Sequence, residues 1–233
     1  MDQERIWEHF QTTRVDSFDH ARGRYAAVVK EVVGRIDRAP ARVLNIGIGA
    51  GVVELARGWQ IAALDPSPEA VAPLARDGID ARCGYAQDIP FETASFDAVI
   101  ASEVLEHIEA GVRRRVLAEI HRVLDDQGWF VGSVPYRENL ADGEVVCPDC
   151  GKIFHRWGHV DSFDLPRVTA ELGAQFDAVT CRRLSFVDWA GARGPVKLLK
   201  AGAQALLGRL GEPIASPSIL FAARKRDGRS RTE

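Results

Sequence analysis

A short apolar strand that runs into closely spaced glycines constrains the fold of this chain more than any other feature. Residues 43–46 form the strand, Gly47, Gly49 and Gly51 follow it, and a helical pattern comes next. A strand, a glycine turn and a helix in this order are typical of α/β folds in which the turn approaches a bound ligand. We therefore expect a ligand site where this first strand ends.

Strands and helices alternate along the rest of the chain, which favours an α/β fold with a parallel sheet. Further strands are expected at residues 61–64, 79–82, 96–101, 128–134, 176–184 and 218–223. Helices are expected at residues 19–37, 67–74, 111–124, 165–172 and 194–210. With the first strand included, the pattern predicts a Rossmann-like, mainly parallel seven-stranded sheet flanked by helices.

We expect one domain with additions, because 233 residues of which 46% are hydrophobic can bury a single full core. Residues 1–39 are expected to form an N-terminal helical cap, and residues 40–233 the main domain. Within the main domain, residues 136–164 form a polar Cys/His insertion after the fifth strand, and residues 187–214 form a helical insertion.

The charge of the chain argues against a polyanionic partner. A formal net charge of -3 and a pI near 6.1 give no overall attraction for nucleic acid or for an anionic membrane. No stretch approaches the roughly 18 apolar residues of a spanning helix, and the N-terminus lacks an apolar signal segment. We expect a cytoplasmic protein without stable membrane insertion, without a nucleic-acid partner, and of undetermined oligomeric state.

Asp65, at the end of the second strand, is the first candidate for ligand binding outside the glycine turn. A carboxylate at this place can accept both hydroxyl hydrogens of a ribose, as in dinucleotide-binding folds. It can equally cap the helix that begins at Ser67. Glycine also serves tight turns that bind nothing. These residues alone leave both possibilities open.

Five segments, taken in order, resemble a known family. They are VLNIGIGAG at 43–51, ALDPSPEAV at 63–71, AQDIPF at 86–91, FDAVIASEVLEHI at 96–108 and HRVLDDQGWFVGSVP at 121–135. This series resembles the class I S-adenosylmethionine-dependent methyltransferases, particularly the group that includes ubiquinone and menaquinone biosynthesis enzymes. The resemblance covers roughly residues 40–135.

The resemblance implies a site for S-adenosylmethionine. The glycines would make room for the methionine part, the acidic end of the second strand would hold the ribose, the AQDIPF segment would contact the adenine, and the end of the fourth strand would flank the sulfonium. These contacts are expected from Asn45, Gly47, Gly49, Gly51, Asp65, Pro66, Asp88, Ile89, Ser102 and Glu103. Asn45 stands where the family usually has Asp or Glu, so the site lacks a charge that could attract the cofactor's ammonium group.

The segment CPDCGKIFHRWGHVDSF at 147–163 combines a CxxC pair with two histidines. Thiolates and imidazoles suit tetrahedral zinc, and CPxCG forms a tight knuckle. We expect zinc at Cys147, Cys150, His155 and His159. The ion would be structural if all four ligands are protein groups, and it could bind an acceptor if one position is open. The alternative is a reduced CxxC in a polar loop, with the histidines in local hydrogen bonds.

Methyl transfer requires few catalytic side chains, because the sulfonium already activates the methyl group and the protein mainly aligns the acceptor. Where a proton must leave, an imidazole can accept it near neutral pH. His107 is therefore one catalytic candidate, although it can also simply pack within its helix. Tyr136 is the second, because it follows the fifth strand on the acceptor side.

The sequence predicts an enzyme that transfers a methyl group from S-adenosylmethionine to a small molecule, at oxygen or nitrogen, by in-line displacement. A second possibility is a zinc-stabilised binding module that keeps the fold without catalysis, for which Asn45 is the visible hint. A third is a methyltransferase that acts on RNA or protein, with the zinc knuckle as recognition element. No residue pattern identifies the methyl acceptor or its pathway.

Overall fold

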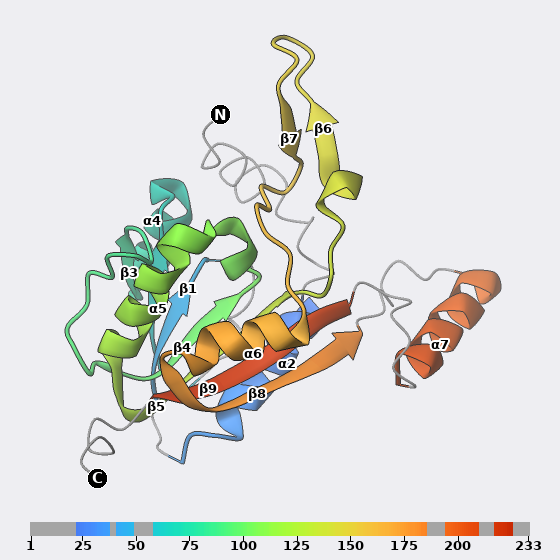
Figure 1. Ribbon diagram of the computed structural model, residues 1–233. Helices are drawn as coiled ribbons and strands as arrows, with labels where there is room; N and C mark the ends of the chain where they lie inside the picture. Colours follow the sequence, from blue (N-terminus) through green and yellow to red (C-terminus); the bar gives the residue numbers. More distant parts are fainter. Residues whose placement is uncertain (1–21, 38–40, 49–57, 186–193, 210–216, 226–233) are drawn as a thin grey trace.

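The structure is a computed structural model, and it describes residues 22–37, 41–48, 58–185, 194–209 and 217–225. Its centre is a seven-stranded sheet in the order β3-β2-β1-β4-β5-β9-β8 (Figure 1). The strands are β1 (Arg42–Ile46), β2 (Gln60–Asp65), β3 (Asp80–Cys83), β4 (Phe96–Ser102), β5 (Leu124–Pro135), β8 (Phe176–Ser185) and β9 (Pro217–Lys225). The pairs among β1 to β5 are parallel, and β9 is antiparallel to both β5 and β8. The predicted mainly parallel seven-stranded sheet is therefore confirmed.

The strand order reverses between β1 and β4, because the chain continues from β1 through β2 to β3 and then returns to the other side of β1. In open α/β sheets, ligands bind outside the carboxyl ends of the strands at such a reversal. All seven residues of β4 are buried, as its continuous apolar run predicts for a central parallel strand. The sheet thus offers a rigid edge on which a site can be built.

Helices cover both faces of this sheet (Figure 1). They are α2 (Arg22–Val33), α4 (Pro68–Arg76), α5 (Ala110–Val123) and α6 (Leu165–Gly173), whereas α7 (Pro195–Arg209) lies to one side of the sheet. Successive strand residues point to opposite faces, so Val99 packs in the core cluster of α5 and α6 while Ile100 packs in the cluster of α2. Among the described helices, none combines the length and apolar composition that a membrane-spanning helix requires.

Two features differ from the sequence-based expectation. Strand β5 begins at Leu124, not at Gly128, because Leu124 is fully buried and pairs with Phe96 of β4. The polar segment after β5 also contains regular structure that its composition does not reveal. It holds η3 (Leu140–Gly143) and a hairpin of β6 (Glu144–Val146) and β7 (Ile153–His155), which projects away from the main sheet (Figure 1).

Candidate functional site

The carboxyl ends of β1, β2 and β4 bring most of the expected cofactor residues to one edge of the sheet. Asn45 and Gly47 lie at the end of β1, Asp65 ends β2, and Ser102 ends β4. Parallel pairing places these strand ends side by side. Gly49 and Gly51 lie outside the described residues, so their expected contacts stay predictions.

Asp65 ties two loops of this edge together. Its side chain is buried, with one carboxylate oxygen accepting from the backbone N–H of Ile48 at 2.8 Å and the other from that of Ser67 at 2.9 Å. The carboxylate thereby joins the glycine turn after β1 to the start of α4, whose N-cap is Ser67. A carboxylate offers about four acceptor positions, so this structural role is compatible with ribose binding.

Gly47 meets two separate requirements for glycine. Its φ is +77°, in the left-handed region that side chains disfavour. A Cβ at this position would also lie 2.7 Å from Cγ2 of Val104. The backbone therefore comes closer to the segment after β4 than any other residue type permits.

Gly47→Ala is expected to lower the free energy of unfolding by about 1–3 kcal/mol, because the left-handed backbone and the Val104 contact both oppose a side chain. Denaturant unfolding followed by circular dichroism measures the change. Gly202→Ala in α7 is the matched control, since a Cβ there would meet nothing within 4 Å. Equal stability of both variants would contradict the requirement for glycine at position 47.

Asn45 presents a buried acceptor at the same edge. The residue is 1% exposed, and its amide nitrogen donates to the Gly47 carbonyl at 3.2 Å. The side-chain oxygen has no hydrogen-bond partner among the described residues. A buried acceptor left without a donor costs roughly 1–3 kcal/mol, so this oxygen suits a ligand donor such as an ammonium group.

Ser102 and Glu103 form a hydrogen-bonded group with Ser133 of β5. Ser133 Oγ donates to Glu103 Oε1 at 2.8 Å, and therefore accepts from Ser102 Oγ, also at 2.8 Å. Glu103 has a φ of +55°, and its N–H donates to the Ser133 carbonyl at 2.8 Å. Non-glycine residues held in this region cluster at functional sites. Sequence reasoning missed Ser133, although a serine within the apolar run of β5 was the available signal.

The AQDIPF loop presents Asp88 and Ile89 differently. The Asp88 side chain is exposed, whereas Ile89 is buried in the core. The Ile89 N–H donates to Glu119 of α5 at 2.9 Å, and its carbonyl accepts from Arg122 at 2.8 Å. Hydrogen bonds from Arg122 hold the pKa of Glu119 below its usual value. Ile89 thus anchors the loop to α5, and Asp88 is the side chain of the two that is open to a ligand.

Three histidines and two glutamates gather beside this edge, and we call them the histidine cluster: Glu106, His107, Glu138, His155 and His159. His107 belongs to η2 (Leu105–His107), directly after β4, while His155 and His159 come from the end of the hairpin. The ring centroids of His107 and His159 are 4.6 Å apart, and those of His155 and His159 are 4.7 Å apart. Burial lowers the pKa of His107 and of His155, which favours neutral imidazoles.

The cysteines lie at the other end of the hairpin. Cys147 N–H donates to the Lys152 carbonyl at 2.9 Å, and backbone N–H groups of Cys150 and Asp149 lower the pKa of the Cys147 thiol. Three residue-to-residue steps along the strand, at about 3.3 Å each, separate position 152 from His155. The structure therefore pairs the cysteines with each other and does not bring them to the histidines, so the four-ligand zinc site is not assembled here.

Tyr136 lies at the carboxyl end of β5, one strand away from Ser102. Its N–H donates to the Pro217 carbonyl at 2.9 Å, and it forms an isolated bridge with Phe163. The guanidinium groups of Arg137 and Arg183 each lie 5.4 Å from its ring centroid. The side chain packs against the core, and its catalytic role stays a prediction.

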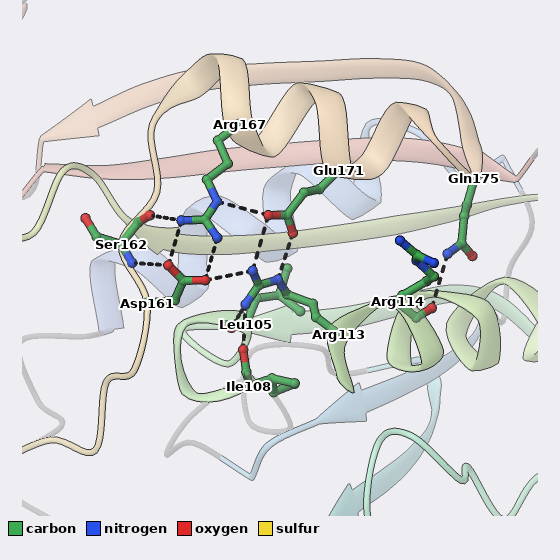
Figure 2. Close-up of polar contacts among 9 residues, drawn as sticks. All are labelled: Leu105, Ile108, Arg113, Arg114, Asp161, Ser162, Arg167, Glu171 and Gln175. Atoms are coloured by element: carbon green, nitrogen blue, oxygen red, sulfur yellow. Dashed lines mark hydrogen bonds and ion pairs between the residues drawn. The ribbon is translucent and has the colours of Figure 1, made fainter. Parts of the chain in front are cut away.

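Arg113 of α5 fixes the segment that follows His159 (Figure 2). Its side chain is 2% exposed and forms ion pairs with Asp161 at 2.8 Å and with Glu171 of α6 at 2.7 Å. It also donates to the Ile108 carbonyl at 2.5 Å, next to η2. Arg167 of α6 contacts the same two carboxylates. This network joins η2, the end of the insertion and α6.

Part of the chain that forms this edge is similar to known proteins. Residues 44–132 match a family model described as a methyltransferase domain. Ubiquinone biosynthesis O-methyltransferases of Xanthomonas oryzae pv. oryzae are 40% identical over 87 residues, which is 33% of this chain and 36% of the relative. That of Methylocella silvestris is 40% identical over 76 residues, 29% of this chain and 30% of the relative. The aligned part thus spans about a third of these curated relatives.

Solved structures match over nearly the whole chain. The Burkholderia thailandensis 1,6-didemethyltoxoflavin-N1-methyltransferase, with bound 1,6-didemethyltoxoflavin and S-adenosylhomocysteine, has a TM-score of 0.63 at 21% identity, covering 97% of this chain and 87% of that chain. A complex of the Haloferax volcanii Trm112 methyltransferase activator with a methyltransferase matches with a TM-score of 0.67 at 18% identity, covering 95% of this chain and 98% of that chain. These matches show the α/β methyltransferase fold.

Proposed function

We propose that the protein transfers a methyl group from S-adenosylmethionine to a small-molecule acceptor, because residues 44–132 match a family model described as a methyltransferase domain. The observation that carries this proposal is the polar edge formed by Asn45, Gly47, Asp65 and Glu103 at the strand-order reversal. The glycine gives space, the carboxylate of Asp65 suits ribose hydroxyls, and the buried Asn45 oxygen suits the ammonium group. These residues fit the cofactor.

When bound, S-adenosylmethionine supplies a methyl group that is already activated. The residues then have to orient the cofactor, exclude water and hold the acceptor in line with the methyl group. Asp65 and Asn45 would fix the two ends of the cofactor, and Glu103 would stand near the sulfonium. His107 and Tyr136 are the proposed groups for removal of the acceptor's proton.

The names of the similar proteins favour a small-molecule acceptor, but they do not decide which atom of the acceptor receives the methyl group. The curated relatives are named as O-methyltransferases, and the Burkholderia enzyme is named as an N1-methyltransferase. We therefore propose methylation at oxygen or nitrogen by in-line displacement. A zinc-stabilised binding module, or a methyltransferase of RNA or protein, is the competing proposal.

Incubation with S-adenosylmethionine and separate sets of phenols, heterocyclic amines and RNA tests the acceptor class. Mass spectrometry measures S-adenosylhomocysteine release and the mass gain of a single methyl group on the acceptor. We expect release to depend on a phenol or an amine. Cofactor binding without release for any set would support the binding module, and release with RNA alone would support the macromolecular alternative.

The predictions for the outer segments stay proposals. Part of the cap expected at residues 1–39 is described, as α2, which packs on the sheet, and α7 lies within the insertion expected at residues 187–214. For the insertion at residues 136–164, we propose that Cys147 and Cys150 supply two zinc ligands at the hairpin tip. Cytoplasmic location stays a proposal from the sequence, and the absence of a nucleic-acid partner is proposed on the charge of the chain.

A further inference from the structure

We propose that Glu106, His107 and His159 bind a divalent transition-metal ion beside the cofactor site. One potential ligand atom of each residue lies within 4.8 Å of those of the other two. His107 Nε2 is 3.9 Å from Glu106 Oε1. Glu106 and His107 come from η2 and His159 from the end of the insertion, so the fold brings the three together from two separate segments.

The other nitrogen of each histidine has a partner of the kind that orients a metal ligand. His107 Nδ1 lies 3.2 Å from the carbonyl oxygen of Gly158, which can only accept, so this nitrogen carries the proton. His159 Nδ1 contacts the carboxylate of Glu138 in the same manner. Ligating histidines typically donate their second N–H to a carbonyl or carboxylate. In both rings, Nε2 is then the nitrogen with a lone pair for the metal.

Glu106 supplies the independent observation that points to a cation. Its side chain is 0% exposed, and neither carboxylate oxygen has a hydrogen-bond partner among the described residues. A buried, ionised carboxylate without a hydrogen-bond partner raises the free energy of the folded state unless it is paired with a cation or coordinates a metal. A divalent cation between Glu106 and two neutral imidazoles would supply the opposite charge directly at its oxygens.

His155 belongs to the cluster but does not suit the role of ligand. Its Nδ1 accepts from the backbone N–H groups of His159 at 3.2 Å and of Trp157 at 3.4 Å, so the proton of the neutral ring sits on Nε2. That nitrogen faces Glu138 Oε1 at 3.7 Å. The backbone of Gly143 also covers it, because a Cβ there would lie 1.8 Å away. His155 is therefore not a ligand of the proposed ion, and it is Glu138 that orients His159.

The ligand set selects the class of ion. Two imidazoles with one carboxylate suit zinc or a similar transition metal, whereas magnesium and calcium prefer oxygen ligands throughout. Three protein ligands leave at least one coordination position for water or an acceptor group. On the proposed function, this position lies near Glu103 and favours an acceptor that binds through a hydroxyl oxygen. The metal itself can be tested without turnover.

Zinc binding is measured on a Cys147→Ser/Cys150→Ser variant, so that the hairpin tip provides no cysteine ligands for zinc. Native mass spectrometry is expected to show one zinc ion per chain, and calorimetric titration gives its Kd. Glu106→Gln should weaken zinc binding by more than about 100-fold, while Glu138→Gln, which loses only the orientation of His159, should weaken it by roughly 10–100-fold. Glu109→Gln, at an exposed position close by, is the matched control and should bind as the parent does.

Circular dichroism verifies that Glu106→Gln folds, and His159→Gln serves as the second ligand variant if it does not. Cobalt substitution adds a signature, because nitrogen and oxygen ligands give visible d–d bands without a thiolate charge-transfer band. Absence of stoichiometric metal in the Cys147→Ser/Cys150→Ser variant, or equal zinc affinity after Glu106→Gln, would overturn the proposal. Calorimetry with S-adenosylhomocysteine on the same samples tests the proposed function separately.

Discussion

Asp65→Ala is expected to weaken S-adenosylhomocysteine binding by roughly 100-fold or more, because two hydroxyl hydrogen bonds to a charged group are worth several kcal/mol. The same change removes the acceptors of the Ile48 and Ser67 N–H groups, which would loosen the rim of the site. Isothermal titration calorimetry measures the affinity. Circular dichroism should show that the fold is retained.

The control for this experiment is Asp77→Ala, which removes an exposed carboxylate at the end of α4. The control should bind S-adenosylhomocysteine with the affinity of the parent protein. If Asp65→Ala also retains that affinity, Asp65 only connects the two loops, and the ribose assignment is wrong.

Arg113→Met should give a large loss of stability, about 1.5–3 kcal/mol in the free energy of unfolding. Methionine fills much of the volume but leaves the Asp161 and Glu171 carboxylates and the Ile108 carbonyl without this donor. Burial opposes ionisation of Asp161, yet hydrogen bonds from Arg167 and Arg113 outweigh it and hold the pKa of its carboxyl below the usual value. Denaturant unfolding measures the difference.

Arg114→Met is the matched control, because the neighbouring side chain is exposed and the contact shown in Figure 2 uses only its backbone carbonyl. This control should change the free energy of unfolding by no more than about 0.5 kcal/mol. Similar losses for both variants would contradict the account of the buried network. Arg113 holds Asp161, which lies two residues after His159 in the chain. Loss of Arg113 should therefore also weaken metal binding at the histidine cluster.

Local signals in the sequence were sufficient to predict the sheet and its edge. Apolar runs locate the strands, and parallel pairing then places Asn45, Asp65 and Ser102 together without further information. The contribution of Ser133 was not predicted, because it depends on the register that sets β5 beside β4. The start of β5 at Leu124 was missed for the same reason.

The histidine cluster depends on contacts that sequence spacing does not encode. His107 and Gly158 are 51 residues apart in the chain, and the return of the insertion to η2 is what joins them. Spacing within residues 147–163 suggested that cysteines and histidines share one ion, but antiparallel pairing of β6 with β7 places them at opposite ends of a hairpin. The buried Glu106 was not a candidate, because an acidic residue in a helical segment is ordinarily exposed.

Calorimetric titration of the parent protein with S-adenosylhomocysteine tests the central claim most directly. The proposed site predicts saturable binding of one molecule per chain. Titration of the Asp65→Ala variant under the same conditions should show a much lower affinity. Absence of binding to the folded parent protein would contradict the methyltransferase assignment and favour a protein that keeps this fold for another purpose.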